Sequence, residues 1–276
     1  MSRFLKLVNF EVNRFWKLYM VLMGVTILSQ LTGVIVVTRS YVNQANKLMY
    51  KELMPKSEFI EQYGTLSFHN ISQTLWFMGP IGLCLVVLSI YVFFIWYRDW
   101  LGKNTFIYRL LMLPTARIHV YLAKATTILF VILGLVALQL LLLPIENQLF
   151  IRLVPNDFRT NLSLYEIMED PYLTILFPNT FREFILYYIG GMAAVLVVFT
   201  AILFERSFRM KGVFYGIVYS AASIFIFLAP ILVNEFVLEN YFYPLELFFM
   251  ELATGLIVLT GAIWAGNFLI KKKVRV

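Results

Sequence analysis

Charged residues are scarce in this chain. Only 14% of its 276 residues are Asp, Glu, Lys or Arg, and 61% are hydrophobic, whereas a soluble domain has about 25% charged and roughly 45–50% apolar residues. A soluble core cannot bury such an excess of apolar residues. A lipid bilayer can, because each spanning helix needs about 20 consecutive apolar residues. The composition therefore predicts one all-α domain, residues 1–276, that lies in a membrane.

Cysteine and phosphate-binding loops are also limited. The single cysteine, Cys84, lies in an apolar run, so the chain can form neither an internal disulfide nor a thiolate metal cluster. No Gly-rich loop ends in Gly-Lys-Ser or Gly-Lys-Thr, so nothing is suited to cradle the phosphates of ATP. We expect no metal, no cofactor and no ATPase site in this chain.

Six apolar stretches are long enough to cross a bilayer. They contain no Lys or Arg except Lys124, and Trp and Tyr stand at several of their ends, as is typical of membrane–water interfaces. The predicted spans are 18–37, 76–96, 121–143, 184–204, 213–233 and 247–270.

The basic residues predict the orientation of these spans. One side of the membrane collects 16 of the 23 Lys and Arg residues but only three acidic residues, Glu11, Asp99 and Glu205. The 16 basic residues are Arg3, Lys6, Arg14, Lys17, Arg98, Lys103, Arg109, Arg117, Lys124, Arg206, Arg209, Lys211, Lys271, Lys272, Lys273 and Arg275. Because cytoplasmic segments are enriched in Lys and Arg, we expect both termini in the cytoplasm of a multi-pass cell-membrane protein. The net charge of +7 then reflects topology rather than nucleic-acid binding.

The first 17 residues predict an amphipathic helix. Apolar residues recur every three or four positions from Leu5 to Trp16, with polar residues opposite them. This pattern is typical of a helix that lies in the membrane interface ahead of the first span. The alternative is an extension of the first span into water, because the polar face includes Glu11 and Asn13.

Three connections are expected outside. The first two, 38–75 and 144–183, are long enough to hold short helices. The second also carries three acidic residues that we expect in a solvated loop rather than around a divalent cation: Glu166, Glu169 and Asp170. The third, 234–246, is too apolar for a freely solvated loop, and a re-entrant helix is one of the two alternatives for it.

The segment 98–117, between the second and third spans, carries the clearest functional signal. Pro114 ends the predicted helix there, and Thr115 is suited to cap the next one. Four residues share one face of the predicted helix: Phe106, Arg109, Leu110 and Leu113. The sequence thus predicts a short amphipathic helix at the cytoplasmic surface, of the kind that docks in a groove of another protein.

Eight residues in and around this segment form a further pattern: an acidic residue, a glycine, a Leu-Leu-x-Leu-Pro-x-x-Arg run and a later lysine. They are Asp99, Gly102, Leu110, Leu111, Leu113, Pro114, Arg117 and Lys124. The pattern resembles the cytoplasmic loop of permease subunits in bacterial type 2 (ABC-2) ABC exporters. Asp99 stands where that family more often has Glu, and the outer loop after the third span is longer than usual. Elsewhere the chain resembles the family only in architecture.

The resemblance implies that 98–117 contains a coupling helix that rests on a separate ATPase subunit. It implies two ATPase copies, which bind ATP and Mg²⁺, and a second permease copy or a homologous permease as partners. The expected function is ATP-driven export of an amphiphilic or hydrophobic compound, such as a drug, an antimicrobial peptide or a lipid-like cargo. The chain itself would be a transporter subunit and not an enzyme.

Two further features lie near the fourth and fifth spans. Glu205 closes the fourth span beside Arg206 and Arg209, so it either pairs with them or contacts the ATPase. Small residues repeat every four positions along the fifth span: Gly212, Gly216 and Ser220. Such a stripe lets another helix approach closely, and we expect this contact inside the subunit rather than between two permeases.

Other classes of function fit less well. His69 and His119 fall on opposite sides of the predicted topology, so they cannot form one metal site or catalytic dyad. Ion-coupled transporters keep ionisable groups near the midplane, where these spans have almost none. An intramembrane protease or lipid-modifying enzyme needs Glu with His, or Ser with His, at membrane depth. A membrane scaffold or sensor fits the spans but leaves the helix in 98–117 unexplained.

Overall fold

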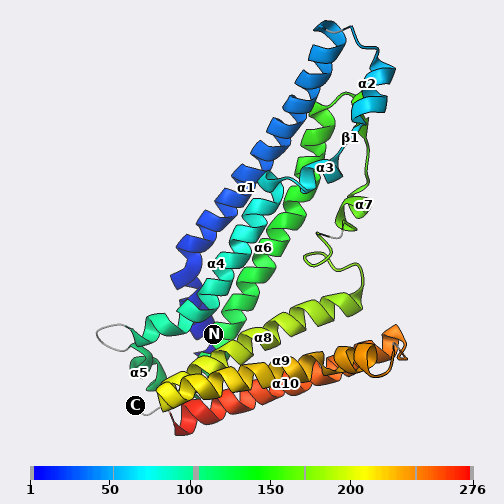
Figure 1. Ribbon diagram of the computed structural model, residues 1–276. Coiled ribbons are helices and arrows are strands. Elements are labelled where there is room, and N and C mark those ends of the chain that lie inside the picture. The colour runs from blue at the N-terminus through cyan, green and yellow to red at the C-terminus, as the bar shows by residue number, and fades with distance from the viewer. Residues whose placement is uncertain (1–2, 52, 102–105, 171, 240, 274–276) are drawn as a thin grey trace. The chain divides into compact units, whose positions relative to one another are not determined.

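The computed structural model describes residues 3–51, 53–101, 106–170, 172–239 and 241–273. Within these residues, six helices are long and apolar enough to cross a membrane (Figure 1). They are α1 (Arg3–Lys51), α4 (Leu75–Trp100), α6 (Ile118–Leu153), α8 (Phe181–Phe208), α9 (Met210–Phe236) and α10 (Pro244–Lys272). Each contains one predicted span, so the all-α class and the six helices of spanning length are as predicted.

The amphipathic amino-terminal segment is part of α1. This helix begins at Arg3 and continues unbroken through the first span to Lys51. The separate interfacial helix predicted over 1–17 is therefore not what the structure has, and the alternative, an extension of the first span, fits. No Gly or Pro occurs between Arg3 and Met23, so nothing in the backbone interrupts the helical hydrogen bonds.

The connections predicted over 38–75 and 144–183 are shorter than expected because α1 and α6 continue past the predicted span ends. Short elements fill what is left: α2 (Lys56–Tyr63), β1 (Leu66–Ser67), α3 (Phe68–Ser72), the 3₁₀ helix η1 (Asn156–Phe158), β2 (Arg159–Thr160) and α7 (Leu164–Met168). β1 and β2 pair in parallel, with Leu66 opposite Arg159. Between α9 and α10 the described residues form turns and no re-entrant helix.

Residues 15–87 and 132–179 form one of two compact units. Its core is aromatic: the ring of Phe68 stands edge-on to Phe77 and to Phe150, with centroids 6.2 and 6.3 Å apart. A polar contact joins α1 to α6 inside this unit, where Gln30 Nε2 donates to Gln139 Oε1 at 3.2 Å. Such amide contacts replace water for polar groups at membrane depth.

The acidic group of this unit is not a uniformly solvated loop. Asp170 is buried and accepts hydrogen bonds from Ser72 Oγ at 3.0 Å and from the ring Nδ1 of His69 at 2.8 Å. Glu166 is exposed, and hydrogen bonds from the backbone N–H and the hydroxyl of Ser163 lower the pKa of its carboxyl. The solvated-loop prediction is therefore wrong for Asp170, which holds α3 to the segment after α7.

The second unit comprises residues up to Arg14, then 88–131 and those from Thr180 onward. Here α8, α9 and α10 pack against one another, and Tyr121 of α6 is buried among them. Its hydroxyl donates to the Leu196 carbonyl at 2.9 Å and lies 3.0 Å from Thr200 Oγ1. A Cβ on Gly266 would lie 3.0 Å from the Tyr121 ring, so the glycine makes room for this side chain.

The small-residue stripe on α9 faces α8 within the chain. A Cβ built on Gly212 would lie 2.0 Å from the Phe204 carbonyl oxygen, and one on Gly216 would lie 2.9 Å from that of Ala201. Ser220, one turn further, is partly buried. The two glycines therefore let the backbones of α8 and α9 approach more closely than any side chain permits.

Candidate functional site

A buried ionic cluster joins three of the long helices within the second unit. Five charged residues form it: Glu11 and Arg14 of α1, Arg98 and Asp99 of α4, and Lys124 of α6. Three are basic and two are acidic, so the cluster carries a formal charge of +1. The cluster thus brings together charged residues near the start of α1, the end of α4 and the start of α6.

Lys124 is the centre of the cluster. Its ammonium group is fully buried and donates to Glu11 Oε1 at 2.7 Å, to the Ile95 carbonyl at 3.0 Å and to Asp99 Oδ2. It also lies 5.4 Å from the centre of the Trp96 ring. All three N–H donors of the lysine are therefore used, which a buried ammonium requires.

The two arginines complete the pairing of the carboxylates. Arg14 Nη1 donates to Asp99 Oδ1 at 2.8 Å, and Arg98 Nη2 donates to Glu11 Oε2 at 2.9 Å. The guanidinium of Arg14 also lies 5.3 Å from the ring centre of Phe106, at the start of α5 (Phe106–Leu111). The cluster thus reaches from three spanning helices to the short helix between α4 and α6.

The short helix α5 buries part of the predicted docking face. Ile107, Leu110 and Leu111 are buried, and Leu110 packs with Leu7 and Val8 of α1 and with Val120 and Ala123 of α6. The Leu-Leu pair therefore fixes α5 to its own chain and is not available to a partner. This differs from the predicted face, in which Leu110 points outward.

Four consecutive or near-consecutive residues at the end of α5 and just after it are exposed: Arg109, Met112, Leu113 and Pro114. Met112 is 72% exposed. The helix ends at Leu111, before Pro114, and a turn follows in which Leu113 N donates to the Leu110 carbonyl. We call these four exposed residues the α5 surface. It combines one cation with three apolar side chains.

The remaining residues predicted for this segment have separate places. Arg117 Nη1 donates to the Ile270 carbonyl at 3.2 Å and so holds the last turns of α10. The hydroxyl of Thr115 has no partner among the described residues, so the predicted cap of α6 is not formed. Gly102 lies outside the described residues.

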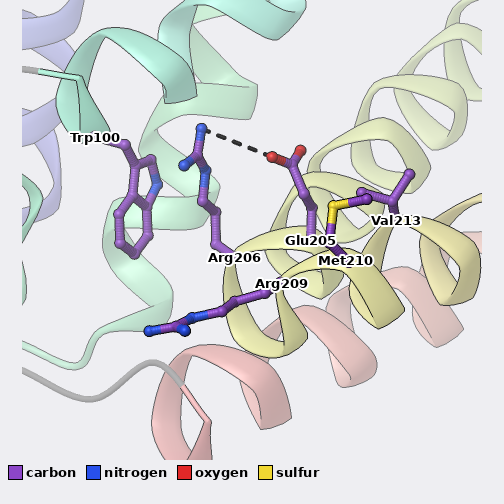
Figure 2. A pocket seen from close by; sticks show the side chains of 6 residues that line it. All are labelled: Trp100, Glu205, Arg206, Arg209, Met210 and Val213. Carbon is purple, nitrogen blue, oxygen red and sulfur yellow. Dashed lines mark ion pairs between the residues drawn. The ribbon is translucent and has the colours of Figure 1, made fainter.

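Glu205 lies outside the ionic cluster, near the ends of α4 and α8. It accepts a hydrogen bond from the Tyr97 hydroxyl and lies 3.8 Å from Arg206 Nη2. Glu205 and Arg206 line a cavity of about 380 Å³ together with Trp100, Arg209, Met210 and Val213 (Figure 2). Of the two alternatives for Glu205, pairing inside the chain is the one present here.

Sequence patterns identified Asp99 and Lys124 but missed Glu11, Arg14 and Arg98 as their partners. Glu11 was assigned to the polar face of an amphipathic helix, and the two arginines counted only toward topology. The sequence did contain a signal for these pairs. The predicted cytoplasmic side has only three acidic residues among 16 basic ones, so each acidic residue is expected to have several cations within reach. Which cation it meets depends on how the helices pack.

Six helices of spanning length, connected in one chain, define a multi-pass α-helical membrane protein. Compared with protein-family models, curated proteins and solved structures, the chain has no match in any of the three.

Proposed function

We propose that the chain is the membrane-spanning permease subunit of an ABC exporter and that the α5 surface docks on a separate ATPase subunit. The observation that carries the proposal is the combination of an exposed surface on α5 with a buried ionic cluster directly behind it. Arg109, Met112 and Leu113 are free to meet a partner, while Leu110 and Leu111 tie the helix to its own chain.

The contacts of α5 give a route for mechanical coupling. Phe106 stacks with Phe10 at 5.8 Å and lies under Arg14, which is bonded to Asp99. A push on α5 therefore acts on α1 and, through the Asp99 and Lys124 pair, on α4 and α6. Closure of two ATPases on ATP would in this way move three spans at once, because a buried cluster in which every charged side chain is paired resists rearrangement.

The partners of the proposal are two ATPase copies, which hold ATP and Mg²⁺, and a second permease copy or homologue. The cargo is an amphiphilic or hydrophobic compound. Aromatic and Met side chains on the spans suit such cargo, as they also suit lipid. Both termini and the α5 surface lie in the cytoplasm in this proposal, in keeping with the 16 basic residues on that side.

Co-purification with a candidate ABC ATPase from the same genome tests the proposal. The tagged chain and the ATPase are expressed together, extracted in mild detergent, and the ATPase retained per chain is quantified. Met112→Glu combined with Arg109→Glu should lower retention about tenfold, equivalent to about 1.4 kcal/mol. Both side chains are exposed, so the variant should keep the elution profile of the unmodified chain.

Leu53→Glu is the control, because Leu53 is also highly exposed but follows the far end of α1. It should retain the ATPase fully. Leu111→Asp does not test docking, because Leu111 is buried and an Asp at this position should disturb folding. Retention that is equal for the Leu53 and the Met112/Arg109 variants would refute docking through α5.

A further inference from the structure

The junction of α8 and α9 is unusually tight for two helices of spanning length. α8 ends at Phe208 and α9 begins at Met210, so Arg209 alone connects them, with φ 54° and ψ −130°. Because each helix is long enough to cross a bilayer, their junction lies at a membrane surface whichever way the chain is oriented. Arg209 therefore stands at the depth of lipid headgroups.

The cavity beside this junction carries net positive charge. Its charged lining residues are Glu205, Arg206 and Arg209. Arg206 is held by Glu205 and by two aromatic rings, with its guanidinium 4.8 Å from the ring centre of Tyr97 and 5.7 Å from that of Trp100. Arg209 is exposed and forms no ion pair with any described residue. Arg209 is thus a cation at the cavity without an ion-pair partner among the described residues.

Two hydrogen-bond donors at the cavity are also unused. The indole N–H of Trp100 and the Nε of Arg206 are both buried from solvent and have no hydrogen-bond partner among the described residues. A buried donor without a partner costs about 1–3 kcal/mol, so a small rotation of these side chains toward an acceptor in the cavity would relieve this cost. Figure 2 shows Trp100 and Arg206 side by side above Arg209.

Two of the other lining residues, Met210 and Val213, are apolar and exposed. Met210 is 85% exposed, and Val213, one turn further along α9, is also exposed. Phe214 extends the same exposed apolar surface along the helix. Lys273, at the end of α10, adds a cation nearby, because its Nζ lies 5.5 Å from the ring centre of Phe208. The site is therefore cationic at one end and apolar at the other.

We propose that this cavity binds the phosphate group of an anionic phospholipid. Arg209 and Arg206 pair with the phosphate oxygens, the Trp100 N–H donates to one of them, and an acyl chain lies along Met210 and Val213. Basic pockets between spanning helices suit anionic headgroups, and arginine binds phosphate with strong charge-assisted hydrogen bonds. A free phosphate would satisfy the same donors but would leave the adjoining apolar surface unused.

Quenching of Trp100 by brominated lipid tests the site. The full chain is reconstituted in phosphatidylcholine nanodiscs with increasing brominated phosphatidylglycerol, and parallel samples receive brominated phosphatidylcholine. The difference between the unmodified chain and Trp100→Phe isolates the signal of Trp100 from that of the other four tryptophans. We expect the anionic lipid to quench Trp100 at a lower mole fraction than the neutral lipid does.

Arg209→Gln should reduce this preference about fivefold. Lys271→Gln is the control, because Lys271 is an exposed cation of α10 that does not line the cavity, and it should keep the preference. Equal preference in the two variants would overturn the proposal. Displacement of the lipid by millimolar glycerol phosphate or inorganic phosphate would also overturn it, because the occupant would then be a soluble anion.

Discussion

Lys124 and Asp99 form a fully buried ion pair between the start of α6 and the end of α4. Glu11 bonds to the same ammonium group from α1. Removing one member of such a pair leaves buried charge without its partner, which typically costs 3–5 kcal/mol. The arginines of the cluster offset part of this loss, because each still pairs with one carboxylate.

We therefore expect Lys124→Met to lower the free energy of unfolding by about 3 kcal/mol. Thermal unfolding in detergent measures it. Lys56→Met is the control, since Lys56 pairs with Asp157 at an exposed site, and such pairs contribute about 0.2–1 kcal/mol. Combining Lys124→Met with Asp99→Leu should cost less than the two single changes together, by about 0.5–3 kcal/mol. Strict additivity would show that the pair is not coupled.

The close approach of α9 to α8 depends on Gly212. A Cβ at this position would meet the Phe204 carbonyl oxygen at 2.0 Å and the Glu205 Cα at 2.8 Å. Both are backbone atoms, so no side-chain rotation relieves the clash. We expect Gly212→Ala to destabilise the protein by at least about 1–3 kcal/mol, the range for overpacked positions, and to lower the yield of folded chain.

Gly191→Ala provides a matched comparison on α8. Nothing lies within 4 Å of a Cβ built there, so the same substitution should be neutral or stabilise the helix by about 0.5–1 kcal/mol. Thermal unfolding and the elution profile of the two variants should therefore differ clearly. If Gly212→Ala unfolds at the same temperature as Gly191→Ala, the helices are not in the predicted close contact.

Hydrophobic length was the most informative property of this sequence for the fold. The apolar runs located all six long helices, because spanning a bilayer sets a length that few other structures need. Helices α1 and α6 continue well past the ends of their apolar runs, since polar residues continue a helix as well as apolar ones do. The residue pattern does not show how far a helix continues beyond its apolar run.

Side-chain partners were the least predictable part. Helical spacing places Leu110 on one face of α5 with Phe106 and Leu113, but it does not show that Leu110 packs against α1 and α6 of the same chain. Asp170 carries no local signal of its burial, because its partners, His69 and Ser72, are about a hundred residues away. Such contacts arise from packing between distant segments, which periodicity within one segment does not report.

Glu146 is an ionisable residue inside a helix of spanning length, where the sequence had placed it in an outer loop. It follows Pro144 on α6, it is fully buried, and neither carboxyl oxygen has a hydrogen-bond partner among the described residues. A buried polar group without a partner costs about 1–3 kcal/mol. Replacing it by an apolar side chain of similar size removes this cost.

We expect Glu146→Leu to raise the free energy of unfolding by about 1–3 kcal/mol, against the usual direction of buried substitutions. Glu235→Leu is the comparison, since Glu235 is an exposed glutamate near the end of α9, and it should change stability by less than about 0.5 kcal/mol. Thermal unfolding of both variants measures the difference. A loss of stability in Glu146→Leu would mean that the carboxyl group has a partner in the folded protein, such as a bound water or cation, and that this partner stabilises α6.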